Sequence, residues 1–280
     1  MDKVVEDLKN QHIEEDNKKT TKKIKHDFPT EIVTLPSKGY FYPPDNPLSS
    51  GKVEIKYMTA HEEDILTSKN LIQKGIVLDE LLRALIVDNG EGKPINMDDL
   101  LLGDKNAILI SARILGYGAE YEFEMQDPST GEKVKDSIDL NMLETKQIDL
   151  SQFEEGQNKF TYQLPISGKN IEFKLLTHSD EREIDVELKK MRKFTKAGGV
   201  EPEITTRMKR AIVSVDGSTD KAEINRFVDV EFLAQDARKF REYLGSVSPD
   251  VDMRYMYTSD DGTETEVTVP MTVNFFWPSA

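Results

Sequence analysis

The sequence SGKVEIKYMT at residues 50–59 decides how the chain is organised, because a close copy, SGKNIEFKLLT, occurs at residues 167–177. When Glu54 to Thr59 is aligned with Glu172 to Thr177, the glutamate, lysine and threonine are identical and the other three positions are apolar in both. A repeat has to be considered before any other feature, because a duplicated unit changes how every other segment is interpreted.

Four further blocks match in the same order along the chain. Residues 82–90 resemble 209–217, residues 95–96 resemble 224–225, residues 101–104 resemble 233–236, and residues 121–140 resemble 253–271. Chance rarely gives five matching blocks in one order, so we interpret the chain as an internal duplication. The prediction is an α+β protein with a flexible N-terminal tail (1–27), a first repeat (28–146) and a second repeat (147–280), each built from one or more strands, helices and a β-hairpin.

The expected elements follow from hydrophobic spacing and turn signals. Strands are expected at 31–35, 53–58 and 159–164, hairpins at 121–140 and 250–269, and helices around 78–86, 104–115, 184–191, 208–215 and 232–247. In both repeats a threonine is followed three residues later by an acid, Thr59 by Glu62 and Thr177 by Asp180. This spacing predicts a capping box at the start of a helix in each repeat. The Gly198-Gly199 pair is expected to form a loop between two helices.

Composition narrows the class of function. Of the 280 residues, 37% are hydrophobic and 32% are charged, and the net charge is −15. Such a chain is not expected to bind nucleic acid or an anionic membrane surface, because both need clustered lysine and arginine. The sequence has no cysteine, so neither a disulfide nor a cysteine metal site is predicted. It also lacks a stretch of about 18 apolar residues and a signal-like N-terminus, so we expect a cytoplasmic protein without membrane insertion.

The first 27 residues are expected to be disordered in the free protein. They contain seven lysines, seven acids and few large apolar side chains, a composition that cannot bury enough apolar surface to fold. Val4, Val5 and Leu8 are spaced for one short amphipathic turn, so ordering on a partner is the alternative.

Two groups of residues invite a catalytic or metal-binding interpretation. His61 and His178 each follow a capping threonine. They could form a metal-binding pair, or they could be solvated residues of a first helical turn. The acidic residues of the same turns suggest a hydrolase or nuclease that uses Mg²⁺: Glu63, Asp64, Asp180 and Glu181. Acids are also favoured there by the helix dipole, so we predict no enzyme activity and no catalytic, metal or cofactor site.

Two aromatic runs are the candidate protein interface. The first is Tyr40, Phe41 and Tyr42, and the second is Phe275, Phe276 and Trp277. Aromatic side chains concentrate at interaction hot spots, but they equally complete a hydrophobic core. Both interpretations are kept for each run.

Several motifs together resemble a known group of proteins. They are Leu35-Pro36-Ser37-Lys38-Gly39-Tyr40, Met58-Thr59 with Glu63-Asp64-Ile65-Leu66, Arg113-Ile114-Leu115-Gly116-Tyr117-Gly118, Leu175-Leu176-Thr177 with Asp180-Glu181, and the ending Phe275-Phe276-Trp277-Pro278. From about Phe28 to Pro278 the chain resembles the baseplate hub and tail-assembly proteins of T-even-like contractile-tailed bacteriophages. Some relatives carry paired cysteines in the first hairpin, like a small zinc ribbon. Here a turn at Asp127 to Gly131 fills that place, and a metal does not carry over.

The resemblance implies a non-catalytic structural or assembly protein of the phage baseplate hub, which bridges neighbouring baseplate or tail proteins. It would be made in the host cytoplasm and kept in the virion tail baseplate, and a homo-oligomer is a further expectation. The alternatives are a transient assembly chaperone that is absent from the mature virion, and a host-type protein-interaction module unrelated to phage.

Overall fold

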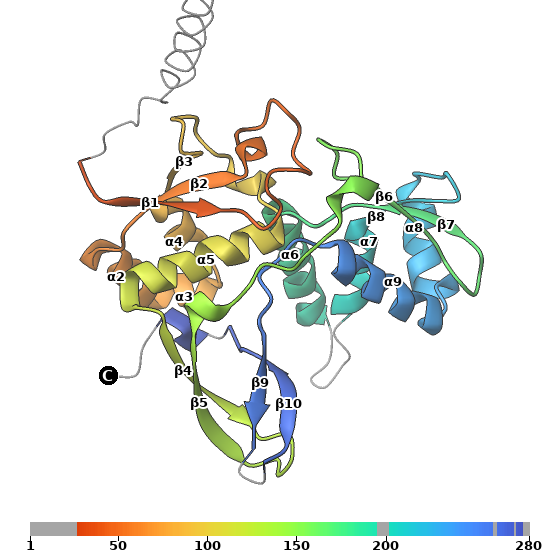
Figure 1. Ribbon diagram of the computed structural model, residues 1–280. Helices are drawn as coiled ribbons and strands as arrows, with labels where there is room; N and C mark the ends of the chain where they lie inside the picture. The colour runs from red at the N-terminus through yellow and green to blue at the C-terminus, as the bar shows by residue number, and fades with distance from the viewer. Residues whose placement is uncertain (1–26, 195–201, 260–261, 272, 277–280) are drawn as a thin grey trace, which may run out of the picture.

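Two three-stranded antiparallel sheets lie apart in the computed structural model, and two β-hairpins lie side by side below them (Figure 1). The structure describes residues 27–194, 202–259, 262–271 and 273–276. The expected tail, apart from Asp27, and the expected Gly198-Gly199 loop therefore lie outside the described residues. The prediction of an α+β fold is confirmed.

The first half of the chain contains one sheet, four α-helices and one hairpin among the described residues. Its sheet has the order β1-β2-β3, from β1 (Thr30–Thr34), β2 (Lys52–Lys56) and β3 (Ile86–Asp88). The helices are α2 (Ala60–Thr67), α3 (Lys69–Lys74), α4 (Val77–Leu85) and α5 (Leu102–Tyr117). The hairpin pairs β4 (Glu120–Gln126) with β5 (Lys133–Asp139). Four short 3₁₀ helices lie in the connections: η1 (Pro47–Ser50), η2 (Met97–Asp99), η3 (Leu140–Met142) and η4 (Leu150–Gln152).

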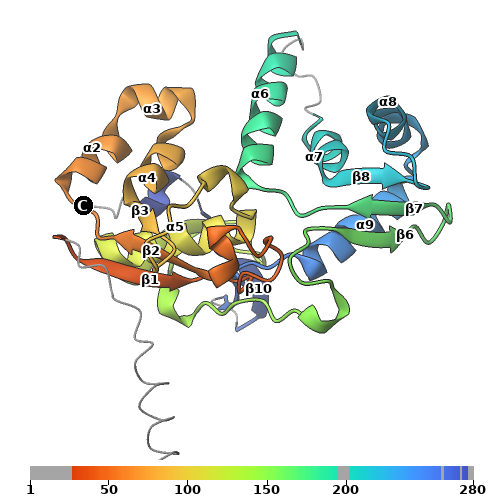
Figure 2. The same ribbon diagram turned by 90° about the horizontal axis from the view of Figure 1, so that it is seen from above.

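The second half has a similar order of elements, with two described helices rather than three between its second and third strands. Its sheet has the order β6-β7-β8, from β6 (Phe160–Gln163), β7 (Asn170–Phe173) and β8 (Ile212–Val215). The helices are α6 (His178–Phe194), α7 (Glu203–Ala211), α8 (Lys221–Arg226), the π-helix η5 (Phe227–Glu231) and α9 (Ala234–Val247). The hairpin pairs β9 (Arg254–Thr258) with β10 (Glu264–Thr268), and η6 (Val273–Phe276) follows it. Seen from above, the two sheets lie at opposite ends of the molecule, and α9 lies against β6 and β7 (Figure 2).

Two helices end earlier than the sequence pattern predicts. Residues 78–86 and 208–215 were each expected to form one helix, but α4 ends at Leu85 and α7 ends at Ala211. The chain then continues directly into β3 and β8, which pair with β2 and β7. A short apolar run is ambiguous between helix and strand, and the β-branched Ile and Val residues of these runs suit a strand.

The two halves also share local details. The register between second and third strands shifts between Glu54 and Ile55 in one half and between Glu172 and Phe173 in the other. These are aligned residues of the sequence repeat. Such shared details are what a duplication predicts, and the duplication itself stays a prediction.

Both predicted capping arrangements are present. Thr59 and Glu62 form a capping box on α2, and Lys56 Nζ lies 2.7 Å from Glu62 Oε1. At α6, Thr177 N–H donates to Asp180 Oδ2 at 3.1 Å, and Lys174 Nζ lies 2.7 Å from the same oxygen. A lysine at the end of the second strand therefore neutralises the capping acid in each half.

The hairpins are joined by hydrogen bonds from the second to the first. Tyr255 Oη donates to Asp136 Oδ2 at 2.6 Å, and Ser259 Oγ donates to Asp127 Oδ1 at 3.0 Å. One hydrophobic core runs through both halves, so the halves are packed together rather than tethered. None of the described helices is long and apolar enough to cross a membrane.

Candidate protein-interaction groove

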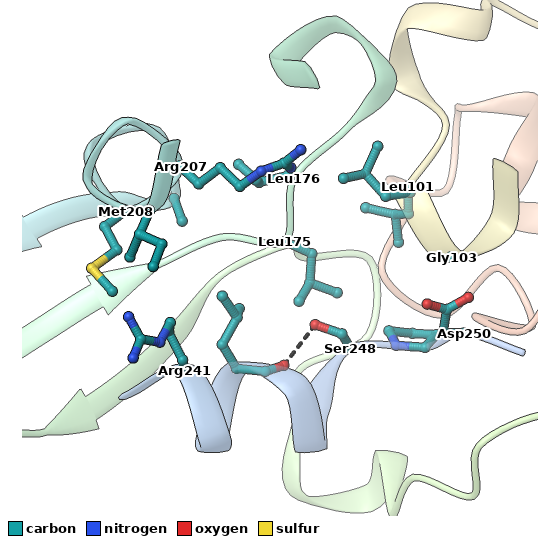
Figure 3. Close-up of a pocket in the computed structure, with 14 residues that line it drawn as sticks. Leu101, Gly103, Leu175, Leu176, Arg207, Met208, Arg241, Ser248 and Asp250 are labelled. Atoms are coloured by element: carbon teal, nitrogen blue, oxygen red, sulfur yellow. Dashed lines mark hydrogen bonds between the residues drawn. The ribbon is translucent and has the colours of Figure 1, made fainter. Parts of the chain in front are cut away.

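A groove of about 320 Å³ lies where the two halves meet. It is bounded by the start of α5, the connection from β7 to α6, the helix α7, and the end of α9 (Figure 3). Its lining residues are Leu101, Leu102, Gly103, Leu175, Leu176, Ile204, Arg207, Met208, Ala211, Arg241, Leu244, Ser248, Pro249 and Asp250. We refer to this set as the junction groove.

Backbone hydrogen bonds between the halves fix one wall of the junction groove. Leu102 N–H donates to the carbonyl oxygen of Leu176 at 3.2 Å, and His178 N–H donates to that of Leu100 at 2.8 Å. Leu101 and Thr177 form the antiparallel bridge between these bonds. The start of α5 is thereby held against the connection that leads into α6.

On the other wall, Gly103 allows the chain that follows α9 to come close to α5. A Cβ atom at this position would lie 1.8 Å from the carbonyl oxygen of Pro249. Only glycine therefore permits the observed distance between backbones. Next to this contact, Asn106 Nδ2 donates to Asp250 Oδ1 at 3.2 Å.

The lining of the junction groove is mostly apolar. Leu101, Leu175 and Met208 are buried, and Leu244 is half-buried on α9. Ile204 is 55% exposed, so it lies at the mouth rather than the floor. A concave apolar surface of this kind is the usual form of a binding site.

Two arginines add positive charge to the same side of the groove. Arg207 comes from α7 and Arg241 from α9, across from Leu101 and Gly103 (Figure 3). Arg207 Nε lies 3.1 Å from Glu203 Oε1. Arg241 is exposed and has no ion pair within the part of the chain that the structure describes. Arg241 is thus available to a ligand that carries carboxylates, whereas Nε of Arg207 is already engaged by Glu203.

The two histidines considered as a metal pair lie in different surroundings. His61 is exposed on α2, whereas His178 is buried beside the junction, with Nε2 3.7 Å from Asp79 Oδ1. Burial lowers the pKa of His178, and nearby Lys105 lowers it further. No group of three or more His, Asp or Glu residues suited to a metal ion is found among the described residues.

The first-turn acids divide into structural and exposed residues. Burial alone raises the pKa of Glu62, but hydrogen bonds from Lys56 and Thr59 outweigh it and lower the pKa to about 2. Asp180 has the corresponding place on α6, while Glu63 and Asp64 face solvent. The buried acids are therefore engaged in capping and ion pairs.

Most of the aromatic interface candidates lie in the core. Phe41, Tyr42, Phe275 and Phe276 are buried, and Tyr40 is half-buried. Trp277 lies outside the described residues. Burial favours the core interpretation for the four buried residues, and a partner contact at any of the six stays a prediction.

Specific contacts hold the buried aromatics in place. Tyr42 Oη donates to Asp104 Oδ2 at 2.6 Å. Arg113 Nε donates to the carbonyl oxygen of Phe275 at 2.7 Å, and the Phe275 ring packs edge-on against Tyr121. A substitution in either run would therefore disturb the fold before any partner contact.

Sequence reasoning did not find the junction groove, because its walls come from segments far apart in the chain. The matching blocks 101–104 and 233–236 mark the starts of α5 and α9, but nothing in them indicates that the two halves meet at the first of these helix starts. The available sequence signal for the groove was weak: Arg207 and Arg241 are two arginines on apolar-faced helices of an acidic chain.

One family model matches the chain from residue 28 to residue 277, and its description is T4 bacteriophage base plate protein. The comparisons with curated proteins and with solved structures give no match. The matched region covers both halves and begins where the expected tail ends. The chain belongs to the T4 bacteriophage base plate protein family.

Proposed function

We propose that this protein is a non-catalytic structural component of the phage baseplate hub, where it bridges neighbouring baseplate proteins. The observation that carries the proposal is the family match over residues 28–277. It spans nearly all of the folded part, so the family assignment applies to both halves and not to a single motif.

The arrangement of the halves supports bridging. Each half has its own sheet, and the two sheets lie at opposite ends of the molecule (Figure 2). Large apolar side chains are exposed in both halves, including Ile72 and Met142 in the first and Val230 and Leu233 in the second. Because each half has its own exposed surface, the protein is suited to contact two neighbours at once.

Quantitative mass spectrometry of purified virions and isolated hub subassemblies tests the proposal. A structural component is expected at a constant stoichiometric ratio to other baseplate proteins in both samples. Presence in hub precursors but absence from virions would instead establish the transient assembly chaperone. Absence from both would overturn the structural role.

Light scattering of the purified chain tests the expected homo-oligomer.

Substitution of exposed acids tests the non-catalytic role. Glu63→Ala with Asp64→Ala is expected to leave tail assembly in infected cells unchanged, because neither side chain is buried. A loss of phage yield without a loss of thermal stability would favour the Mg²⁺-dependent alternative.

A further inference from the structure

We propose that the junction groove binds a segment of a partner baseplate protein in which one or two large aliphatic side chains stand next to carboxylates. This inference rests on the proposed function, because it names the kind of partner segment that a bridging protein would hold. The occupant follows from three properties of the groove: its volume, its charge and its rigidity.

The volume and lining set the apolar part of the occupant. A space of about 320 Å³ equals roughly ten water molecules at about 30 Å³ each, which is enough for two large side chains. Leu175, Leu176 and Met208 lie along it. An aliphatic side chain placed here releases water from apolar surface, which favours binding.

The charge sets the polar part of the occupant. The lining holds Arg207, Arg241 and one acid, Asp250, in a chain of net charge −15. Because Glu203 pairs with Arg207, Arg241 supplies the positive charge of the groove that is unpaired among the described residues. The acid in the lining, Asp250, accepts a hydrogen bond from Asn106. Arginine binds carboxylates through paired N–H groups, and a positive rim attracts acidic segments while it repels basic ones.

The groove is formed before any partner arrives. Its walls are held by the bridge of Leu101 with Thr177 and by the close contact of Gly103 with Pro249. Binding then orders few groups of this chain, and less of the interaction free energy is lost to ordering.

Fluorescence anisotropy with three labelled synthetic peptides tests the occupant on the full chain. The first peptide carries Leu-Leu-Glu-Asp between Gly-Ser flanks, the second replaces the acids by Gln-Asn, and the third replaces the leucines by Ser-Ser. The first peptide is expected to bind about tenfold more tightly than either other, and added salt should weaken it most. Equal affinities for the three peptides would overturn the proposal.

Matched variants locate the binding. Arg241→Glu is expected to weaken the acidic peptide about tenfold. Arg238→Glu, on the same helix but outside the groove lining, should leave the affinity within twofold. Because the chain has no cysteine, a photo-crosslinker can be attached to Ile204→Cys alone, with Val186→Cys on α6 as the exposed control. Crosslinking that is equal at both positions would contradict a site in the groove.

A fourth peptide, residues 1–10 of this chain, separates an internal occupant from a partner. Its Val4-Val5-Glu6-Asp7-Leu8 sequence has the same mixture of apolar and acidic residues. Tighter binding of this peptide than of the Leu-Leu-Glu-Asp peptide would overturn a partner segment in favour of the chain's own N-terminus. Failure of all peptides, with the protein still present in virions, would reject the groove inference and leave the proposed function intact.

Discussion

The starts of α5 and α9 have nearly the same backbone but different surroundings. Leu101 precedes α5 with φ −63° and ψ 147°, and Leu233 precedes α9 with φ −59° and ψ 139°. Each helix has an aspartate at its third position, Asp104 and Asp236, which accepts hydrogen bonds from the loop between the first two strands of its own half. The two helix starts thus use one device, an acid at the N-terminus that holds a loop.

The length of that loop makes the difference. The loop at 35–51 folds over α5, so that Tyr42 Oη accepts a hydrogen bond from Leu101 N–H at 2.9 Å and Leu101 is only 3% exposed. The loop at 164–169 is shorter, and Leu233 is 48% exposed. Leu101 is covered by this loop and by its bridge to Thr177 of the other half, whereas Leu233 stays half exposed although Asp236 is buried.

The pKa values of the two aspartates shift in opposite directions, because burial prevails at one and hydrogen bonds prevail at the other. Burial raises the pKa of Asp104. Burial also acts to raise the pKa of Asp236, but hydrogen bonds from Ile166 and Ser167 outweigh it and lower the pKa. Asp104 therefore costs stability in its ionised form, whereas Asp236 contributes stability when ionised.

The largest effect predicted for a single substitution is the loss of the acid at the start of α5, compared with the loss of the acid at the start of α9. Asp104→Ala leaves the hydroxyl groups of Ser37 and Tyr42 buried without their acceptor, and we expect a loss of about 3 kcal/mol in the free energy of unfolding. Asp236→Ala should cost about 1 kcal/mol, because Ile166 and Ser167 are exposed and water can replace the lost acceptor. Urea denaturation of both variants measures the difference. Equal losses would show that the loop over α5 is not what makes its acid important.

Two glycines in helices give the next largest effect and test the joint between the halves. Gly103→Ala places a Cβ against the backbone of Pro249, and we expect the free energy of unfolding to fall by about 1–3 kcal/mol. Gly245 on α9 has no atom within 4 Å of an added Cβ, so Gly245→Ala should raise it by about 0.5–1 kcal/mol. Thermal denaturation of both variants provides the comparison. Stabilisation by both alanines would mean that the halves do not approach at Gly103.

The sequence predicted local features better than contacts between distant segments. The capping boxes at Thr59 and Thr177 depend on residues three apart, and both are present. The strands β3 and β8 were missed, because their apolar residues continue the helical spacing of the preceding helix. The match of Leu85 with Ile212 was also displaced by one residue. In the structure Ile86 and Ile212 lie opposite Ile55 and Phe173, which are aligned positions of the predicted repeat.

The junction groove depends on how one half packs against the other, and no local pattern encodes that. Its apolar residues have ordinary places on the core-facing sides of α5, α7 and α9 in the sequence. They form a groove only because Leu102 pairs with Leu176 and Gly103 lies against Pro249. For the same reason, the sequence alone could not show whether the aromatic runs at 40–42 and 275–277 pack in the core or contact a partner.

The capping acid of the first half predicts a dependence of stability on pH. The pKa of Glu62 is lowered from 4.5 to about 2 in the folded protein, so the folded state favours the ionised form. Its contribution is complete above about pH 4.5 and is lost as the pH falls through about 2. We expect Glu62→Gln to reduce the fall in unfolding free energy between pH 5 and pH 2.5, measured by urea denaturation. An unchanged dependence would place the acid response at other carboxylates.

The smallest predicted effect is at the open helix start. Leu233→Ala should change the free energy of unfolding by about 0.5 kcal/mol, because nearly half of the side chain already faces water. The equivalent Leu101→Ala removes a buried side chain and should cost about 2–3 kcal/mol. Differential scanning calorimetry compares the stability of the two variants, in which the same side chain is shortened in the same way. If Leu233→Ala were as costly as Leu101→Ala, the second helix start would also be a covered joint, and the contrast between the halves would disappear.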